Sequence, residues 1–213
     1  MPNITTYQYF NKPNELYLPL AVQQIVSSGA TAAPNSQTEI TNLITEIERD
    51  ILLNSLGLTQ YNFLQVALAD LPNADQKWKD LVNGVEYDGK VWEGLNNDLS
   101  LLAYAVKYFY LNGNTQFITS VGVAVPQSEN ATTVNPAYKL VNCWNKFITK
   151  YQGGLRDCPE YYYKNGATVI DWIGSNANQI EVSLYRFLID KKEDYEFDAG
   201  KFMVYENQNT FGI

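Results

Sequence analysis

The chain has 213 residues and 46% of them are hydrophobic, which is enough to build one domain around a packed core. Its net charge of −8 argues against a nucleic-acid-binding surface, since such a surface needs clustered lysine and arginine. The chain has no histidine, which removes the commonest general base and zinc ligand and every Ser-His or Cys-His nucleophile pair. We therefore expect a protein that is not an enzyme.

Residues 1–35 are predicted to form an N-terminal arm that closes in a linker of small residues at 27–34. Its aromatic residues are too apolar for a free tail, so we expect them to contact either this subunit or a neighbouring one. The predicted contact residues of the arm are Tyr7, Tyr9, Phe10 and Tyr17. The sixteen tyrosines of the chain suit such half-buried positions, at an interface or at the rim of a core.

A helix is predicted to begin at Ser36, where Ser36 and Glu39 have the spacing of a capping box. Apolar residues then recur every three or four positions, which gives the helix one apolar face. That face consists of Ile40, Leu43, Ile44, Ile47, Ile51 and Leu52. Gly57 is the predicted stop, and shorter helices are predicted from Thr59 and around Trp78.

Two turn dipeptides, Asn83-Gly84 and Asp88-Gly89, bracket the short segment 85–87. A long helix is predicted from about Val91 to Leu111, ending at 112–114. Its apolar positions fit a helical period and are Leu95, Leu99, Leu102, Val106, Phe109 and Tyr110.

The loop 113–135 is predicted to project from the helices and holds few charged residues. Its segment Gln116 to Val125 is rich in threonine and valine and is predicted to form a short hairpin or an extended finger. The next helix has Pro136 in its first turn and ends at Gly153-Gly154. Its apolar stripe consists of Leu140, Val141, Trp144, Phe147, Ile148 and Tyr151.

Residues 156–200 are predicted to form an additional, partly helical segment. The composition of 161–163 and 168–173 is typical of strands, and 180–192 is predicted to be helical. The acidic stretch 193–198 lacks the glycine and terminal glutamate of a calcium loop and is predicted to be a solvated linker.

The last residues, 201–213, have no helical pattern but carry apolar side chains, which predicts an extended C-terminal docking tail. Together with the projecting loop, this tail gives the predicted subunit or portal interface. Its residues are Phe117, Val121, Val123, Val125, Phe202, Val204, Tyr205, Phe211 and Ile213.

No catalytic, metal-binding or cofactor-binding residues are predicted. Glu46 and Asp50 are a carboxylate pair at i, i+4, but they fall opposite the apolar stripe and are predicted to be solvated. Cys143 lies on a helical apolar pattern. A disulfide between Cys143 and Cys158 stays open, and two free thiols are the favoured alternative. With no stretch of about 20 apolar residues and no signal-peptide pattern, we expect a protein used in a soluble setting.

Three landmarks resemble the head–tail connector (adaptor) proteins of tailed bacteriophages. They are the junction 56–64 after the capped helix, the segment 92–95 that opens the predicted long helix, and the segment 119–123 that follows that helix. The closing residues 209–213 add to the resemblance, which is strongest to adaptors of Bacteroides-infecting and crAss-like phages. It covers most of 36–155 and the last residues, whereas 156–200 departs from it.

The resemblance implies a mainly α-helical bundle of the adaptor type over 36–155, with a projecting loop or short hairpin and extended terminal arms. Such proteins are structural components of the virion, at the head–tail junction, and are assembled in the host cytoplasm. They form a ring of about twelve copies under the portal protein, extend the DNA channel and hold the next tail component. DNA would pass without sequence-specific binding, and no membrane is involved.

Two other functions remain open from the sequence. One is a tail-completion or stopper protein of the same particle, which the identity of its partner would distinguish from an adaptor. The other is a small carboxylate-dependent metal-binding protein, which would need acidic residues gathered at buried positions.

Overall fold

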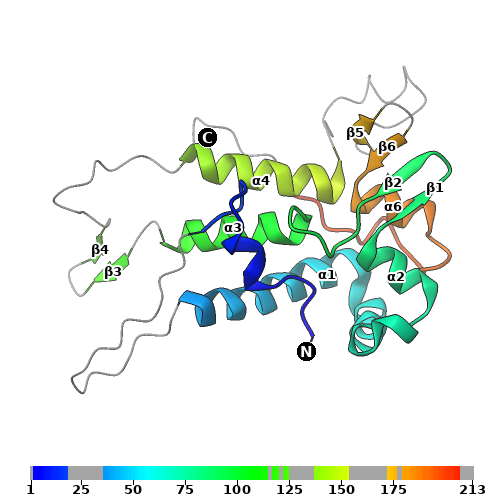
Figure 1. Cartoon of the computed structure of the whole chain (residues 1–213), viewed down its shortest axis with the longest axis horizontal. Coiled ribbons are helices and arrows are strands. Elements are labelled where there is room, and N and C mark those ends of the chain that lie inside the picture. Colours follow the sequence, from blue (N-terminus) through cyan, green and yellow to red (C-terminus); the bar gives the residue numbers. More distant parts are fainter. Residues whose placement is uncertain are drawn as a thin grey trace.

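The computed structural model describes residues 2–18, 36–114, 117–119, 122–124, 137–153, 172–176 and 179–206. This part of the chain is mainly α-helical, as predicted, with a small sheet at one end (Figure 1). In chain order the elements are η1 (Tyr7–Asn11), α1 (Ser36–Ala69), η2 (Leu71–Asn73), α2 (Gln76–Asn83), β1 (Val85–Tyr87), β2 (Lys90–Trp92), α3 (Leu101–Asn114), β3 (Phe117–Thr119), β4 (Gly122–Ala124), α4 (Ala137–Gln152), β5 (Trp172–Asn176), β6 (Gln179–Val182) and α6 (Leu184–Asp190).

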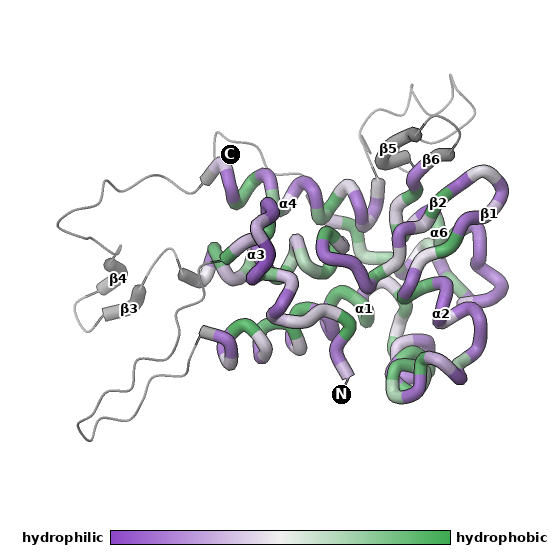
Figure 2. The backbone as a smooth tube through the Cα atoms, viewed as in Figure 1, coloured by the Kyte–Doolittle hydropathy of each residue, from purple (hydrophilic) through white to green (hydrophobic). Residues whose placement is uncertain are grey.

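Helix α3 is the centre of the fold. Every side chain from Leu101 to Lys107 is buried, and α3 packs against both α1 and α4. The first half of α1 turns its hydrophobic residues toward α3 and its hydrophilic residues away (Figure 2). The predicted apolar face of α1 is confirmed: Ile40, Ile44, Ile47, Ile51 and Leu52 are buried, and Leu43 is half-buried.

Helix α1 is broken at Gly57, where the sequence predicts a stop. Gly57 has φ 75° and ψ 165°, a conformation that a residue with a Cβ rarely adopts. Beyond the break the chain is helical again up to Ala69, as predicted from Thr59. The second half of α1 is seen nearly end-on in Figure 1, whereas the first half runs across the view. The break therefore turns the second half away from the line of α3.

The predicted helix start at Val91 is wrong. Residues 85–92 form an antiparallel hairpin, closed by Asp88 and Gly89, whose φ values of 47° and 71° are those of a type I′ turn. Helix α3 begins only at Leu101, where the Ser100 hydroxyl accepts a hydrogen bond from the Ala103 N–H at 3.2 Å. The helical spacing of apolar residues continues on both sides of this helix start, so the sequence pattern did not reveal that Ser100 caps the helix. As a result Leu99, predicted on the apolar stripe, is 38% exposed.

Gly84 and Gly94 bring the chain back onto α2 after the hairpin. Gly94 has φ 84°, and a Cβ built on it would lie 2.4 Å from the Gly84 nitrogen. The following Leu95 N–H bonds the Val82 carbonyl at 2.9 Å, and the Trp92 indole N–H bonds the Leu81 carbonyl at 3.0 Å. This close approach of two backbones fixes where the chain leaves the sheet and enters α3.

The sheet has the strand order β1-β2-β6-β5. Strand β2 pairs in parallel with β6, and the other neighbours are antiparallel. The prediction of a helix from 180 is wrong for its first residues, because Gln179–Val182 is strand β6. Ser183 separates strand from helix by accepting a hydrogen bond from the Arg186 N–H at 3.2 Å. The strand predicted at 168–173 is described only from Trp172 onward, and 161–163 lies outside the described residues.

The N-terminal residues 2–18 pack on their own subunit. The buried carboxylate of Glu48 in α1 accepts the N–H of Ile4 at 3.0 Å and of Thr5 at 2.5 Å, and burial raises its pKa. Further along the segment, Phe10 and Leu16 are fully buried. Of the two partners that the sequence left open for this arm, the structure assigns its own subunit over these residues.

The residues after the acidic stretch also join the core. Phe202 is 7% exposed and stacks on Tyr151 of α4 with ring centres 4.6 Å apart. Tyr205 packs against Trp144, Phe147 and Tyr151, and its N–H bonds the Gln152 side chain at 2.8 Å. The chain up to Glu206 is therefore a part of the helical body and not a separate tail.

The predicted hairpin in the loop is confirmed. Strands β3 and β4 pair antiparallel, with Ile118 opposite Val123. In Figure 1 this hairpin lies beyond the ends of α3 and α4, apart from the helices.

We expect Gly94→Ala to destabilise the protein far more than Gly89→Ala. Both glycines have positive φ, so both variants carry a backbone cost of about 1 kcal/mol. Only at Gly94 would the new methyl group also meet backbone atoms, which adds roughly 1–3 kcal/mol of overpacking. Urea unfolding of the two variants measures the difference. Equal losses would mean that the approach of Gly94 to Gly84 is not tight.

We expect Glu48→Ala to release the first residues of the N-terminal segment, because the buried N–H groups of Ile4 and Thr5 would lose their acceptor. Hydrogen exchange should show faster exchange of these two amides, with the amides of α3 unchanged. Thr45→Ala is the matched control on the same helix, since it removes only exposed hydrogen bonds, to Asn3 and to the Thr41 carbonyl, and leaves the Glu48 carboxylate in place. Equal protection of Ile4 and Thr5 in both variants would contradict the role of Glu48.

Candidate functional site

The described residues contain no group of three or more histidine, cysteine, aspartate or glutamate side chains that could hold a metal. Glu46 and Asp50 are exposed, as predicted. Cys143 is a buried free thiol whose pKa is raised by burial, and Cys158 lies outside the described residues. Among the described helices, none has the length and apolar character to cross a bilayer. The surface features of this part of the chain point to binding instead.

The second half of α1 exposes three large apolar side chains to solvent: Leu58 (66% exposed), Phe63 (54%) and Val66 (75%). Tyr61 and Leu64 of the same half-helix are buried, and so is Ala67, which lies one helical turn after Phe63. The half-helix therefore carries apolar side chains on the face that packs against the core and also on part of its solvent-exposed face. A face of this kind is a candidate for contact with another protein.

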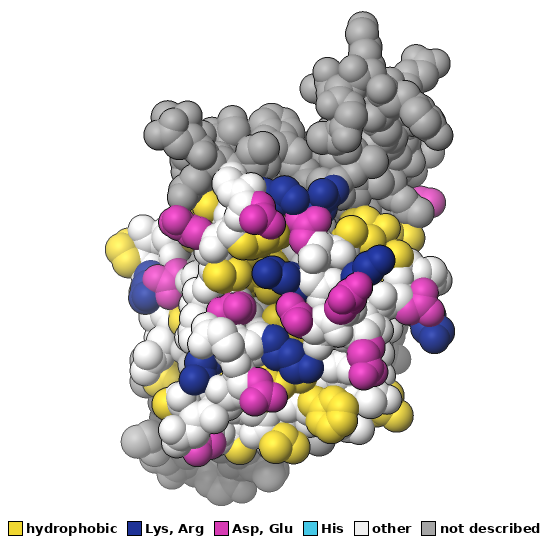
Figure 3. Space-filling model, turned by 90° about the vertical axis from the view of Figure 1, so that its right-hand side faces the viewer, with side chains coloured by type: hydrophobic (Ala, Val, Ile, Leu, Met, Phe, Trp, Pro, Cys, Tyr) yellow, Lys and Arg dark blue, Asp and Glu magenta, His cyan; other side chains and the backbone are white. Residues whose placement is uncertain are grey.

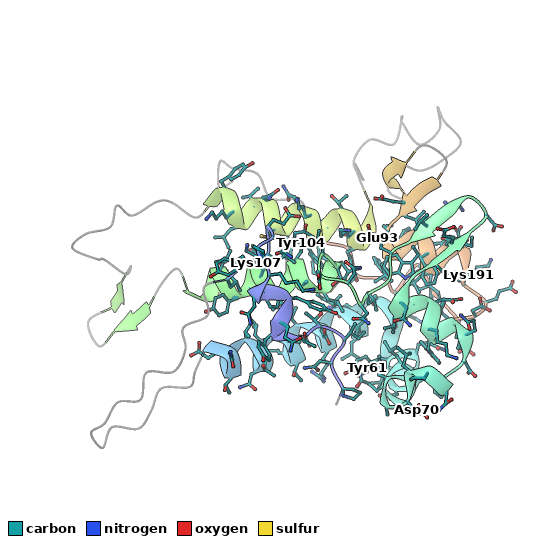
Figure 4. The ribbon with its side chains drawn as sticks, in the orientation of Figure 1. Tyr61, Asp70, Glu93, Tyr104, Lys107 and Lys191 are labelled. Atoms are coloured by element: carbon teal, nitrogen blue, oxygen red, sulfur yellow. The ribbon has the colours of Figure 1, made fainter. Side chains whose placement is uncertain are left out.

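A groove of about 500 Å³ lies beside these side chains, between the second half of α1 and the start of α2. Its lining residues are Phe63, Val66, Ala67, Asp70, Asn73, Ala74, Asp75, Lys77 and Trp78. Apolar side chains gather along the lower edge of the face shown in Figure 3, whereas charged side chains of both signs cover its middle. Figure 4 places Asp70 at this end of the molecule. The groove has an apolar floor and a polar rim.

Tyr195 packs against Trp78, one of the residues that line the groove. It is buried in the middle of the acidic stretch, packs edge-on against Trp78 at 5.6 Å, and donates its hydroxyl to the Lys77 carbonyl. Burial, with a smaller contribution from Asp80, raises the pKa of Tyr195, so the hydroxyl remains a donor. The Lys77 ammonium lies 5.0 Å from the Trp78 ring and bonds the Asp194 carbonyl at 2.7 Å. The acidic stretch 193–198, predicted to be a solvated linker, is therefore anchored by the buried ring of Tyr195. The many charged residues around Tyr195 gave no sign of this burial in the sequence.

Helix α6 holds this anchor in place through Asp190. The Asp190 carboxylate accepts hydrogen bonds from Lys90 at 2.6 Å and Tyr87 at 3.1 Å, and pairs with Arg186 at 2.8 Å. Burial alone would raise the pKa of Asp190, but the bonds from Lys90 and Arg186 outweigh burial and lower it. This cluster joins α6 to the β1–β2 hairpin, and Phe187 of α6 in turn packs against Tyr195 at 5.7 Å.

The structure describes five of the nine predicted interface residues, and these five lie in two separate places. Phe117 and Val123 lie on the two strands of the β3–β4 hairpin, whereas Val121, Val125, Phe211 and Ile213 lie outside the described residues. Phe202 and Tyr205 contact the aromatic residues of α4, so within this subunit they are core residues and not free anchors. Of the three predicted interface residues that the structure describes in the tail, Val204 is the most exposed, at 37%.

The predicted contact residues of the N-terminal arm are also divided between buried and exposed positions. Phe10 is fully buried, and Tyr7 and Tyr9 are partly buried against the core of this subunit. The Tyr9 hydroxyl donates to Asn96 at 2.5 Å. Tyr17 is 52% exposed and is the one of the four that solvent reaches freely.

Sequence reasoning missed the exposed apolar side chains Leu58, Phe63 and Val66. A signal was present, because Phe63 and Val66 are three residues apart and so lie on one side of the helix, away from Leu64. In a helix whose apolar residues surround the axis, only the structure shows which side is left open.

Comparisons with protein-family models, with curated protein sequences and with solved structures found no match to this chain.

We expect Asp190→Asn to lower stability at neutral pH by about 1–2 kcal/mol, because the bonds from Lys90 and Arg186 lose their charged acceptor in a partly solvated site. The folded pKa of Asp190 is lowered, so its contribution is present above the unfolded pKa of about 3.9 and is lost as pH falls through the folded pKa. Urea unfolding from pH 7 to pH 2 should therefore show the variant approaching the wild type in acid.

Glu86→Gln is the control, since Glu86 is exposed on the neighbouring strand β1. It should change stability little at any pH. A deficit of Asp190→Asn that stays constant down to pH 2 would show that packing, and not charge, accounts for the effect.

Proposed function

We propose that this protein is a structural subunit of a larger assembly, and more specifically a head–tail adaptor of a tailed bacteriophage. In this role it forms a ring of about twelve copies beneath the portal protein, extends the DNA channel and offers a platform for the next tail component. It acts through shape and subunit contacts, without catalysis, at the head–tail junction of the virion.

The observation that carries the proposal is the apolar ridge of Phe63 and Val66, which line the groove. Exposed apolar side chains in a groove that also has polar lining residues have the anatomy of a protein–protein interface, and a monomer gains nothing by leaving them in water. In a closed ring each copy meets the next head-to-tail, so this surface would contact a different, complementary patch on the neighbouring copy.

The phage assignment is supported by two of the three sequence landmarks. The junction 56–64 coincides with the break in α1 at Gly57, and the segment 119–123 includes residues of the paired strands β3 and β4. The landmark at 92–95 does not open a helix, because it begins at Trp92, the last residue of strand β2, and ends before α3. The net charge of −8 is compatible with a wall along which DNA passes without sticking.

The test is native mass spectrometry of the purified chain, alone and with the portal protein encoded in the same genome. We expect a complex of about twelve copies to form with the portal. The double variant Phe63→Ser/Val66→Ser should stay folded but fail to join it, because it removes the apolar ridge.

Tyr138→Ser is the matched control: Tyr138 is 72% exposed on α4, away from the groove. A wild-type chain that ignores the portal would contradict the adaptor role. A ring that forms equally with the ridge variant would keep the role but move the interface away from the groove.

A further inference from the structure

Among the strands that the structure describes, β3 and β4 form a sheet of their own, which no strand of the larger sheet joins. None of the six paired residues, Phe117–Thr119 and Gly122–Ala124, is charged. The register sets Ile118 opposite Val123, and opposite residues of an antiparallel pair share one face of the hairpin. A two-stranded hairpin is at best marginally stable by itself in water. This uncharged hairpin would therefore be stabilised by a surface on which one of its faces packs.

The groove between the second half of α1 and the start of α2 offers an apolar surface of this kind. Phe63 and Val66 are exposed along it, and the buried side chains of Ala67 and Trp78 also line it. Its volume of about 500 Å³ is that of a pocket for a small ligand, which gives room for a few side chains but not for a whole helix. One face of a short hairpin has a suitable size.

The charges at the groove restrict its occupant. Asp70 and Asp75 are exposed, so an acidic segment would be repelled, whereas an uncharged one leaves both carboxylates in water. The Lys77 ammonium is already bonded to the Asp194 carbonyl at 2.7 Å. The paired residues of the hairpin bring no carboxylate, and Lys139, exposed in the first turn of α4 at the same end of the molecule, has the sign opposite to that of the two aspartates.

The hairpin and the groove lie at opposite ends of the molecule (Figure 1), and Figure 4 places Asp70 of the groove at the end away from the hairpin. The 14 residues of α3, about 20 Å of helix, lie between these two ends. The hairpin is thus far from the groove of its own chain, whereas a second copy can bring its groove to the hairpin. Two different patches at opposite ends are what head-to-tail association requires.

We propose that the β3–β4 hairpin of one copy occupies the groove of the next copy, with the face of Ile118 and Val123 against Phe63 and Val66. This inference rests on the proposed assembly of the subunit into a ring, and it names the two surfaces that meet there. A contact of this size is small for a stable interface between two chains. Closure of the ring compensates for that weakness, because each copy is then held by a hairpin and by a groove at once.

The test mixes two full-length variants that each lack one of the two surfaces. The groove variant is Phe63→Ser/Val66→Ser, and the hairpin variant is Ile118→Ser/Val123→Ser. Neither should associate with itself at about 1 mM, whereas their mixture should form a dimer and nothing larger, because one intact hairpin and one intact groove remain. Light scattering measures the mass. With the hairpin variant isotope-labelled, NMR should show saturable shifts of the amides at 63 and 66 and of the Trp78 indole N–H when the groove variant is added.

Ile118→Val/Val123→Ile is the matched control, since it keeps this face of the hairpin apolar and of the same volume. It should associate as the wild type does, and the melting temperature of every variant shows that it is folded. Self-association of the hairpin variant as strong as that of the wild type would overturn the proposal, since another surface would then fill the groove. A mixture of folded variants that stays monomeric would overturn it as well.

These outcomes are distinct from a failure of the adaptor role, because the mixture contains no portal protein. A mixed dimer formed by a chain that ignores the portal would keep the contact and contradict the adaptor role. A ring on the portal that the hairpin variant joins as readily as the wild type would keep the adaptor role and overturn the contact.

Discussion

The complete burial of the first half of α3 is the constraint on which the rest of the fold depends. Its residues 101–107 include Tyr104 and Lys107, so two polar side chains are carried into the interior with the apolar ones (Figure 4). The N-terminal segment supplies their partners through Glu15. Its carboxylate accepts from Tyr104 and from Lys146 of α4, and its backbone carbonyl accepts from Lys107. Burial lowers the pKa of Lys107, yet the carbonyl gives its ammonium group an acceptor. The N-terminal segment is therefore held on the core by two kinds of contact: its hydrogen bonds to the polar side chains of α3, and the burial of its own apolar residues.

The same logic explains why the C-terminal residues fold inward. Helix α4 turns Trp144, Phe147 and Tyr151 to one side, and α3 alone does not cover all of their surface. Phe202 and Tyr205 complete an aromatic cluster there, and the Trp144 indole N–H donates to the Glu206 carbonyl at 2.8 Å. Aromatic side chains in a segment without helical periodicity can anchor a neighbouring subunit or close the core of their own. In this protein Phe202 and Tyr205 close the core of their own subunit, because the aromatic rings of α4 lie within contact distance.

The sequence was sufficient for the elements whose signals are local. The apolar face of α1, its break at Gly57, the turn at Asp88-Gly89 and the stripe of α4 all follow from periodicity and turn chemistry. It failed at α3, where two local signals competed. The helical spacing of apolar residues begins before Ser100, although the helix itself starts only after the cap at Ser100. It also missed Glu48 and Tyr195, because a buried carboxylate and a buried ring in an acidic stretch depend on partners far along the chain. The same limit applies to the groove, which exists only because α2 returns to the side of α1.

The groove and a second cavity, at the break in α1, lie along one half-helix, and this arrangement restricts the partner. Phe63 and Val66 border the groove, and Leu58 and Gln60 border the cavity, so a partner laid along this half-helix meets apolar surface and then negative charge. Asp70 and Asp75 on the rim of the groove have the same sign as Glu196. A partner with apolar side chains and a nearby basic one would match this order. A phosphate backbone would meet more carboxylates than lysines here, since Lys77 and Lys201 stand against Asp70, Asp75, Glu196 and Asp198. The half-helix therefore favours a protein partner over nucleic acid, as the proposed adaptor role requires.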